Sequence, residues 1–388
     1  MEDSEIFEKE TLNKLHLNSP PGGWFPALQD LYWCINESNS SCTDLFFSPH
    51  LKRIRIYVSW MWDHDPIPPG ILPILAPIIL TLPTSGLEQM SVGDGYQAMV
   101  WAHFKDSFSS TILRCGPSFT EYNSPVPLSN AALDHLIHLP RLRTWHIHGP
   151  PPTYPTSSLP LVFPPLRELT LWKGAACGWF PLLRCLEDGA STTQGVTPLD
   201  KAKKSLKVLS VKDMFGINID PSFVSTIQCF RNLVYLYVYD FCPGEDERGE
   251  CIFKLNNDNV TELAMALTQL ESLILGGPCS KNTCLTTIAC LLPISVHCSE
   301  LEQLEIHFNT TNIADDFRNI LEDPRFQQLR SLPRCPLTSL NVYRTPLSLD
   351  ESGFEIVAKG MVDIFPSLED CNGFEEGWTE LSEKIMDL

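Results

Sequence analysis

Hydrophobic residues recur along this chain in one short pattern, a leucine followed three and five residues later by further apolar residues. In the segment FPPLRELTLW, leucines stand at positions 166, 169 and 171, with polar residues between them. Side chains alternate between the two faces of a β-strand, so Leu169 and Leu171 share one face and the residues between them share the other. The pattern therefore predicts short strands with one apolar and one polar face.

The pattern returns along nearly the whole chain. A degenerate copy begins at Phe108, and the other copies begin at Leu12, Leu28, Leu51, Leu87, Leu142, Leu166, Leu206, Leu233, Leu270, Leu301, Leu337 and Leu368. Between most copies lies a segment with helical periodicity. Each of these segments has a Ser, Thr or Asp that can accept the unpaired N–H groups of a first helical turn. We predict helices opened by Ser129, Asp220, Asp258, Thr283 and Asp350.

Each unit thus consists of a helix, a turn and a short strand. Such a strand cannot bury its leucines alone, so neighbouring units must stack, with parallel strands and with helices over the leucines. This is the signature of leucine-rich repeats. The sequence predicts an α/β solenoid with a parallel sheet on its concave face and helices on its convex face. Strands are expected at 169–171, 236–238, 273–275 and 304–306 in one parallel sheet.

The repeats are irregular in length. Successive copies are separated by 16 residues (12 to 28) to 40 residues (166 to 206), whereas regular arrays repeat every ~20 to 29 residues. Segments rich in Pro, Ser, Thr and Gly account for the excess and are interpreted as insertions. We expect residues 1–371 to form about 12 to 13 irregular repeats, the first of them incomplete. Residues 372–388 are expected to form an acidic tail or a capping helix.

Charge narrows the classes of partner. The net charge is −19, from 28 basic and 47 acidic residues. Nucleic-acid binding needs clustered Lys and Arg, so a nucleic-acid partner is not expected. The longest apolar run, Ile71 to Leu82, is interrupted by Pro73 and Pro77 and is shorter than the ~20 residues of a membrane span. We interpret it as a buried helix and expect no membrane partner.

Compartment and redox state follow from the N-terminus and the cysteines. The opening MEDSEIFEKE has neither a basic nor an apolar stretch, so no signal peptide is expected. This favours a cytoplasmic or nuclear protein, in which the 14 cysteines remain thiols and many lie in the core.

Motifs for catalysis are missing from the sequence. It contains no G-x-S-x-G, no G-x-x-x-x-G-K-[S/T], no H-E-x-x-H and no G-x-G-x-x-G. Cys279, Cys284, Cys290, His297 and Cys298 are close in sequence, but their spacing lacks the paired geometry of structural zinc sites. Core thiols are the favoured interpretation. We therefore expect no enzyme activity, no cofactor and no metal.

Four histidines form a second candidate group for binding a metal. His135 and His138 lie three apart on a predicted helix, whereas His146 and His148 alternate on the next strand. Four histidines can bind a metal. No carboxylate pattern of a metalloenzyme surrounds them, so we favour ordinary helix and strand positions.

Binding is instead predicted at the strand positions between the leucines. These residues line the concave face, the usual binding surface of a curved solenoid, and Tyr, Trp and Arg dominate interface hot spots. Three tyrosines on one strand make the strongest case, although aromatic residues also cover neighbouring strands. The candidate binding residues are Arg53, Arg55, Tyr57, His146, His148, Glu168, Trp172, Tyr235, Tyr237, Tyr239, Glu305, His307 and Tyr343.

The order of several segments also resembles a known family. FPALQDLYW, LFFSPHLKRIRI, LSNAALDHLIHLPRLRTWHI, FPPLRELTLW and FPSLEDCNGF are similar to segments of the F-box/leucine-rich-repeat proteins of mushroom-forming fungi, roughly from Phe25 to Phe374. The resemblance implies repeats that present a substrate or another protein. In that family an N-terminal F-box docks on the Skp adaptor of a ubiquitin ligase. Here a repeat-like strand, TLNKLHL, is expected from Thr11, so no F-box residue is matched.

Two functions therefore stay open. The first is a non-catalytic protein-recognition scaffold that resembles the substrate receptors of ubiquitin ligases, which would need an F-box upstream of Met1 to reach the Skp adaptor. The second is a stand-alone binding or inhibitor protein without a link to ubiquitin, and an enzyme is a distant third.

Overall fold

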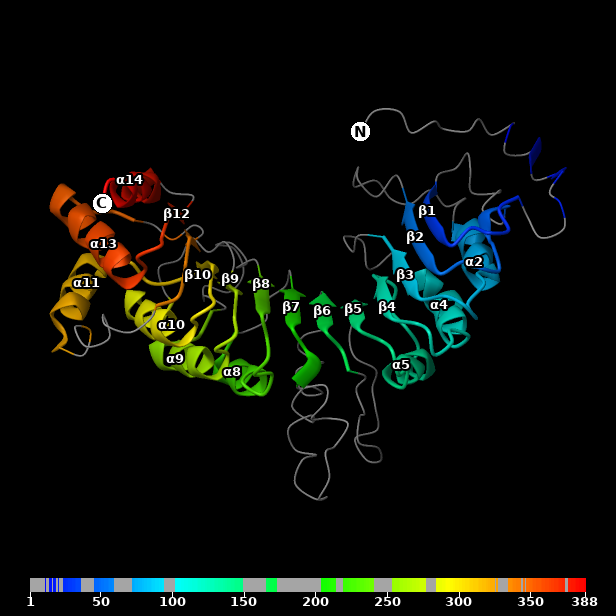
Figure 1. Cartoon of the computed structure of the whole chain (residues 1–388), viewed down its shortest axis with the longest axis horizontal. Helices are drawn as coiled ribbons and strands as arrows, with labels where there is room; N and C mark the ends of the chain where they lie inside the picture. The colour runs from blue at the N-terminus through cyan, green and yellow to red at the C-terminus, as the bar shows by residue number, and fades with distance from the viewer. Residues whose placement is uncertain are drawn as a thin grey trace, which may run out of the picture. The chain divides into compact units, whose positions relative to one another are not determined.

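The computed structural model divides the chain into two compact units, Met1–Leu166 and Arg167–Leu388. The structure describes residues 11, 14–15, 17–18, 20, 24–35, 45–58, 72–93, 102–148, 165–172, 204–213, 219–240, 253–276, 284–324, 326, 334–342, 345, 347–373 and 376–388. Each unit combines a parallel sheet with helices (Figure 1).

The first unit contains a parallel sheet whose strands follow the order of the sequence. Its strands are β1 (Asp30–Ile35), β2 (Arg53–Val58), β3 (Gln89–Val92), β4 (Glu121–Ser124) and β5 (Thr144–His148). Helix α4 packs against both α2 and α5 beside this sheet. The helical segments are α2 (Leu72–Thr81), η3 (Ala102–Phe104), α4 (Lys105–Ile112) and α5 (Asn130–Ile137).

The second unit repeats this architecture with more strands, again parallel and in sequence order. Its strands are β6 (Glu168–Trp172), β7 (Val208–Asp213), β8 (Tyr235–Asp240), β9 (Ser272–Gly276), β10 (Gln303–Ile306), β11 (Ser339–Asn341) and β12 (Asp370–Asn372). The strands predicted at 169–171, 236–238, 273–275 and 304–306 are confirmed in one parallel sheet. Helices follow one side of these strands (Figure 1). They are α8 (Pro221–Ile227), α9 (Asn257–Ala266), η5 (Ile288–Cys290), α10 (Leu291–His297), α11 (Ile313–Glu322), α13 (Glu351–Ile364) and α14 (Glu376–Met386).

Strand register stacks the predicted apolar positions in rows that cross each sheet. In the second unit one row is almost pure leucine, and all its members are buried: Leu169, Leu209, Leu236, Leu273, Leu304, Leu340 and Cys371. The corresponding row of the first unit is Leu31, Ile54, Met90, Tyr122 and Trp145, which are equally buried. The arrangement is compatible with a solenoid-like repeat, because each strand buries its apolar face only together with its neighbours.

The predicted helix starts are confirmed at three positions. The side chain of Ser129 accepts a hydrogen bond from the N–H of Ala132, and Asp220 and Asp350 cap α8 and α13 in the same way. The start predicted at Asp258 is wrong by two residues. Asn256 is the cap of α9, where it forms a reciprocal capping box with Asn259. Asp258 lies in the first turn, where its charge favours the helix dipole.

The remaining helix start, Thr283, lies outside the described residues, and Thr287 caps the short helix η5 instead. The apolar run predicted to be a buried helix forms α2, which contains Pro77 and buries Ile78 and Ile79. Among the described helices, none is both long enough and apolar enough to cross a membrane.

The strand predicted near the N-terminus, TLNKLHL, is wrong. The described residues of the TLNKLHL segment, Thr11, Lys14, Leu15 and Leu17, are helical. Leucines three apart also fit one turn of a helix, and Leu15 packs against Leu45.

The copy assigned to Phe108 lies in α4, where Phe108 and Ile112 are buried four residues apart as a helix requires. The strand of that repeat is β4, which was missed because its apolar positions are Phe119 and Tyr122 in place of leucines.

The C-terminal residues form a helix that packs on the end of the second unit. Trp378, Leu381 and Ile385 of α14 are buried, and α14 contacts both α13 and β12. The Lys384 Nζ lies 2.6 Å from the Glu351 carboxylate at the start of α13. Helix α14 therefore covers the apolar surface at this end of the sheet with one apolar side and presents an acidic outer side.

Candidate functional site

The predicted binding residues of the second unit lie together on one side of its sheet. We call this side the polar face, defined as the side opposite to the leucine rows. Register aligns the residues between the leucines, among them the predicted Glu168, Trp172, Tyr235, Tyr237 and Tyr239, in three rows across β6, β7 and β8. These rows are Glu168, Val208 and Tyr235; then Thr170, Ser210 and Tyr237; then Trp172, Lys212 and Tyr239. Parallel pairing thus brings residues from successive repeats to strand spacing, about 4.8 Å.

Two tyrosines form an aromatic surface on β8. The rings of Tyr235 and Tyr237 stack with their centroids 6.1 Å apart, and both side chains are half-buried. The Tyr235 hydroxyl donates a hydrogen bond of 2.6 Å to the carboxylate of Glu271. This bond, together with the negative charge of Glu271, raises the pKa of Tyr235, because both disfavour a phenolate. Tyr235 is therefore oriented by the neighbouring strand, and its ring remains beside that of Tyr237.

The third row carries a cation held over an indole ring. The Nζ of Lys212 lies 4.7 Å from the centroid of the Trp172 ring, a geometry that attracts an ammonium to the ring face. Thr170 and Ser210, in the middle row, are buried. Trp172 of β6 and Lys212 of β7 thus contact one another, whereas Tyr235 of β8 bonds to Glu271, which precedes β9.

An acidic row begins beyond β8, at the residue directly before each strand. Backbone N–H groups of successive members donate hydrogen bonds of 2.8 to 3.0 Å to the carbonyls of the members before them, along Lys207, Val234, Glu271, Glu302, Thr338 and Glu369. Glu271, Glu302 and Glu369 are exposed. This row was not predicted, although the dipeptide Leu-Glu recurs at 270–271, 301–302 and 368–369 and was a signal for it.

Two binding residues were predicted at strand β10, Glu305 and His307, and only Glu305 lies on the polar face. Glu305 is half-buried on the polar face, where register places it between Ile274 and Asn341. His307 is buried, with 1% of its surface exposed, so its assignment to the binding face is wrong. The reason is that β10 ends at Ile306 and the alternation of faces ends with it.

The buried histidine instead takes part in the packing of the C-terminal cap. Its Nδ1 lies 2.9 Å from the Thr345 hydroxyl, which donates its own proton to the carbonyl of Val342 at 2.7 Å. His307 Nδ1 must therefore be the donor in its bond to Thr345. The Trp378 indole N–H of α14 donates to the Thr345 carbonyl at 2.7 Å. Tyr343, the last predicted residue, lies outside the described residues.

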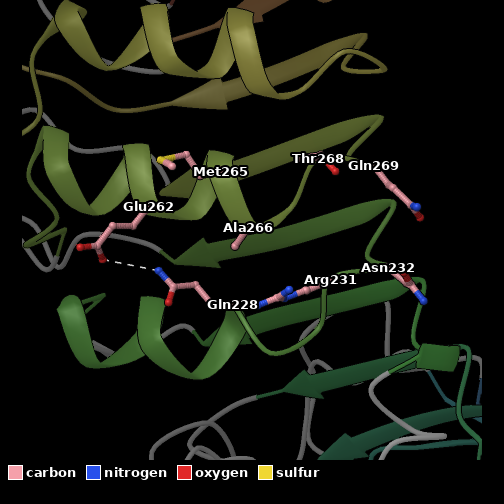
Figure 2. Close-up of a pocket in the computed structure, with 8 residues that line it drawn as sticks. All are labelled: Gln228, Arg231, Asn232, Glu262, Met265, Ala266, Thr268 and Gln269. Atoms are coloured by element: carbon pink, nitrogen blue, oxygen red, sulfur yellow. Dashed lines mark hydrogen bonds between the residues drawn. The ribbon is translucent and has the colours of Figure 1, made fainter.

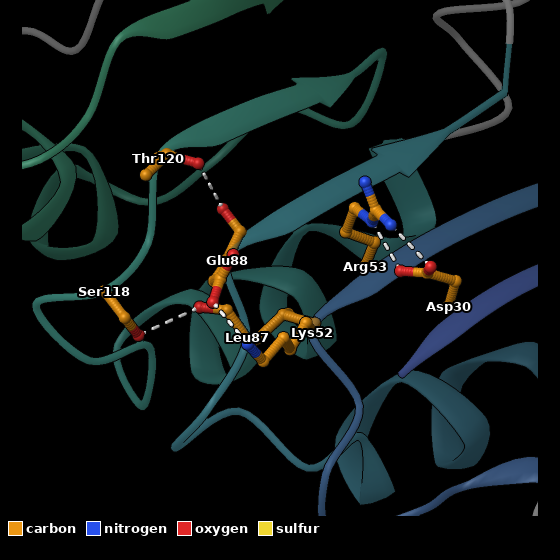
Figure 3. A network of polar contacts seen from close by, with 7 residues as sticks. All are labelled: Asp30, Lys52, Arg53, Leu87, Glu88, Ser118 and Thr120. Atoms are coloured by element: carbon orange, nitrogen blue, oxygen red, sulfur yellow. Dashed lines mark hydrogen bonds and ion pairs between the residues drawn. The ribbon is translucent and has the colours of Figure 1, made fainter. Parts of the chain in front are cut away.

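The predicted residues of the first unit belong to pairs within their own sheet. Arg53 of β2 is hydrogen-bonded to the carboxylate of Asp30 of β1, and Lys52 lies 3.4 Å from Glu88 (Figure 3). The Arg53 guanidinium holds the pKa of Asp30 below its usual value.

The aromatic and remaining basic residues of this sheet follow the same alternation. Tyr57 stacks on Tyr32 with ring centroids 4.8 Å apart, and the exposed Arg55 is paired in register with Tyr32. His146 is half-buried, whereas His148 ends β5 and its side chain is not described.

The described cysteines of the candidate zinc group are buried, and His135 and His138 lie beside backbone carbonyls. Cys284, Cys290 and Cys298 are buried, and burial raises the pKa of Cys298 to about 12. His135 Nε2 lies 2.9 Å from the Cys115 carbonyl, and His138 Nδ1 lies 2.7 Å from the Asp134 carbonyl. In the part of the chain that the structure describes, no group of three or more His, Cys, Asp or Glu side chains is placed to hold a metal ion. Cys279 lies outside those residues.

A shallow depression of about 680 Å³ lies on the helical side of the second unit. It is located between the C-terminal ends of α8 and α9, and Arg231, Glu262 and the exposed Met265 are among its lining residues (Figure 2). Gln228 Nε2 lies 3.5 Å from the Glu262 carboxylate across it. Its lining is polar and open, with no nucleophile beside a base, so it offers less for recognition than the polar face.

Comparison with models of known protein families and with curated protein sequences found no match to this chain.

Proposed function

We propose that this chain is a non-catalytic leucine-rich-repeat scaffold that recognises another protein through the polar face of its second unit. The observation that carries the proposal is the alignment of tyrosines and charged residues from successive strands on one face, opposite the buried leucine rows. Tyr, Trp and Arg are the residues on which interface energy concentrates. Half-buried tyrosine rings beside exposed carboxylates combine apolar contact area with hydrogen-bonding groups in one surface.

A photo-crosslinking experiment tests this proposal. A photoreactive amino acid at Tyr237, on the polar face, is expected to crosslink a specific partner in extracts of the source cells. The same residue at Met265 is the matched control, since Met265 is exposed on the helical side beside the depression. Crosslinks from Met265 but not from Tyr237 would move the binding site to the helices and overturn the proposal.

The resemblance to F-box/leucine-rich-repeat proteins supports a receptor role in a ubiquitin ligase, and the same surface also serves a stand-alone binding protein. The two differ in whether the chain docks on the Skp adaptor. Co-elution of the purified chain with that adaptor in size-exclusion chromatography assigns the receptor role, whereas separate elution assigns the stand-alone role to the chain as given.

A further inference from the structure

We propose that the polar face at strands β8 to β12 binds an extended segment of the partner that is rich in Lys or Arg. The inference rests on the proposed function and deepens it, because it names the chemistry of the partner. Five neighbouring strands span about 19 Å, which an extended peptide of about six residues covers. The residues that carry the inference are Tyr235, Tyr237, Glu271, Ser272, Glu302 and Glu369.

The acidic row supplies the charge that a basic segment would neutralise. Glu271 and Glu302 occupy adjacent positions on neighbouring strands, because the N–H of Glu302 donates to the carbonyl of Glu271 at 2.9 Å. Glu369 follows two strands later. Like charges directly opposite one another destabilise a sheet. Among the described residues no cationic side chain pairs with any of these three carboxylates, and Lys207, in the same row, is directed to Gln269.

In the corresponding row of the first unit, a basic and an acidic residue on neighbouring strands neutralise each other. There Lys52 and Glu88 occupy adjacent positions and form an ion pair at 3.4 Å. One position further along β2, Arg53 pairs with Asp30 in the same way (Figure 3). In the second unit the basic residues of this row, Arg167 and Lys207, stand before β6 and β7, whereas the carboxylates stand before β9, β10 and β12. Glu271, Glu302 and Glu369 therefore have no cation beside them in the row.

The tyrosines add a surface suited to the same cations. The stacked rings of Tyr235 and Tyr237 lie beside Glu271, whose carboxylate accepts a hydrogen bond from the Tyr235 hydroxyl. A Lys ammonium or Arg guanidinium is attracted both to a carboxylate and to an aromatic face. An acidic partner segment would be repelled by the three glutamates.

A buried hydroxyl between these groups gives an independent reason to expect a peptide. Ser272 is the first residue of β9, and register places it between Tyr235 of β8 and Gln303 of β10. Leu273 points into the core, so Ser272 points to the polar face. Its side chain has 2% of its surface exposed, and its Oγ has no hydrogen-bond partner among the described residues. A buried hydroxyl without a partner is costly, and a backbone group of a bound peptide would supply that partner.

Fluorescence anisotropy with defined peptides tests the inference on the full chain. The first probe is a labelled peptide of alternating Lys and Gly residues, and the second replaces each Lys with Glu. We expect the Lys peptide to bind, with an affinity that falls as salt rises, and the Glu peptide not to bind. Equal binding of the two peptides, or binding of the Glu peptide alone, overturns the inference.

Paired variants separate the polar face from the overall negative charge. Glu302→Gln with Glu369→Gln removes two carboxylates of the acidic row, and we expect it to weaken binding of the Lys peptide about fivefold or more. Glu262→Gln with Glu322→Gln removes two exposed carboxylates from α9 and α11 and is expected to change binding less than about twofold. Equal losses in the two pairs would show a general attraction to an acidic chain and overturn the inference.

The serine provides a variant whose effect on stability has the opposite sign to its effect on binding. Ser272→Ala removes a hydroxyl without a partner, so the melting temperature is expected to stay or to rise while the Lys peptide binds more weakly. Unchanged peptide affinity removes Ser272 from the site and counts against the inference. A partner crosslinked at Tyr237 together with no binding of the Lys peptide leaves the proposed function standing and overturns this inference alone.

Discussion

The two units carry the same strand pattern but use the polar face differently. In the first unit, acidic and basic residues alternate along the sheet and pair with each other, as in Asp30 with Arg53 and Lys52 with Glu88. In the second unit, Glu271 and Glu302 stand side by side, and two tyrosines lie next to them. A sheet that neutralises its own charges has satisfied its electrostatics within the fold. A sheet that places like charges together presents a surface suited to a charged partner.

The cores of the two units differ as well. The central row of the second unit is leucine from β6 to β11, whereas the first unit fills the equivalent row with Met90, Tyr122 and Trp145. Both rows are buried to a similar degree. Apolar residues of different shape thus satisfy the same stacking requirement, since volume and burial matter more than residue identity. The pattern of faces is the conserved feature between the units, and the residues that occupy it are not.

The largest effect on stability is expected from a core residue of β8, and its neighbour on the polar face provides the comparison. Leu236 is fully buried and Tyr237 is half-buried on the polar face of the same strand. Leu236→Ala is expected to lower the free energy of unfolding by about 2 to 5 kcal/mol, since it leaves a cavity. Tyr237→Ala is expected to cost less stability and to weaken partner binding by about 1 to 4 kcal/mol. Urea unfolding and binding of the crosslinked partner measure the two quantities.

Two outcomes would break this contrast. If Tyr237→Ala destabilises the chain as much as Leu236→Ala, the tyrosine is part of the packing and the division of β8 into two faces fails. If Tyr237→Ala changes neither stability nor binding, the tyrosines only cover the sheet, and the partner must bind elsewhere.

A pH experiment sharpens the description of the first unit. The Arg53 guanidinium lowers the pKa of Asp30 in the folded chain. A carboxyl whose folded pKa is depressed stabilises the fold above its unfolded pKa of about 3.9, and the contribution disappears as pH falls through the lowered folded value. Asp30→Asn should therefore lower the melting temperature at neutral pH, and the difference from the native chain should shrink below about pH 4. A difference that is independent of pH would mean that the pair contributes nothing electrostatic.

Sequence reasoning found the strands where the leucines are regular. Among the described strands, all except β4 begin two residues after a leucine of the predicted series, because L-x-x-L-x-L carries a two-residue alternation that a helix does not share. It failed where that signal was weak. Phe108 and Ile112 are four apart and belong to a helix, while β4 follows Phe119 and buries Tyr122 where the pattern has leucines.

The candidate site was predictable only in part, for a physical reason. Alternation places Tyr235, Tyr237 and Glu305 on the polar face, but it cannot tell where a strand ends, and His307 lies one residue beyond β10. Alternation also gives no information on the register between strands. The acidic row exists because Glu271 and Glu302 are paired across a ladder, and one residue of slip would have separated them.

The most direct measurement compares two glutamates that occupy equivalent row positions in the two units. Glu88→Gln removes a carboxylate that is paired with Lys52, whereas Glu302→Gln removes one that stands beside Glu271. At low salt, Glu88→Gln is expected to lower the melting temperature slightly and Glu302→Gln to raise it, each by the equivalent of about 0.2 to 1 kcal/mol. High salt should shrink both changes. Opposite signs agree with a first unit that neutralises itself and a second unit whose acids are placed for a partner; a loss of stability in both variants would contradict that account.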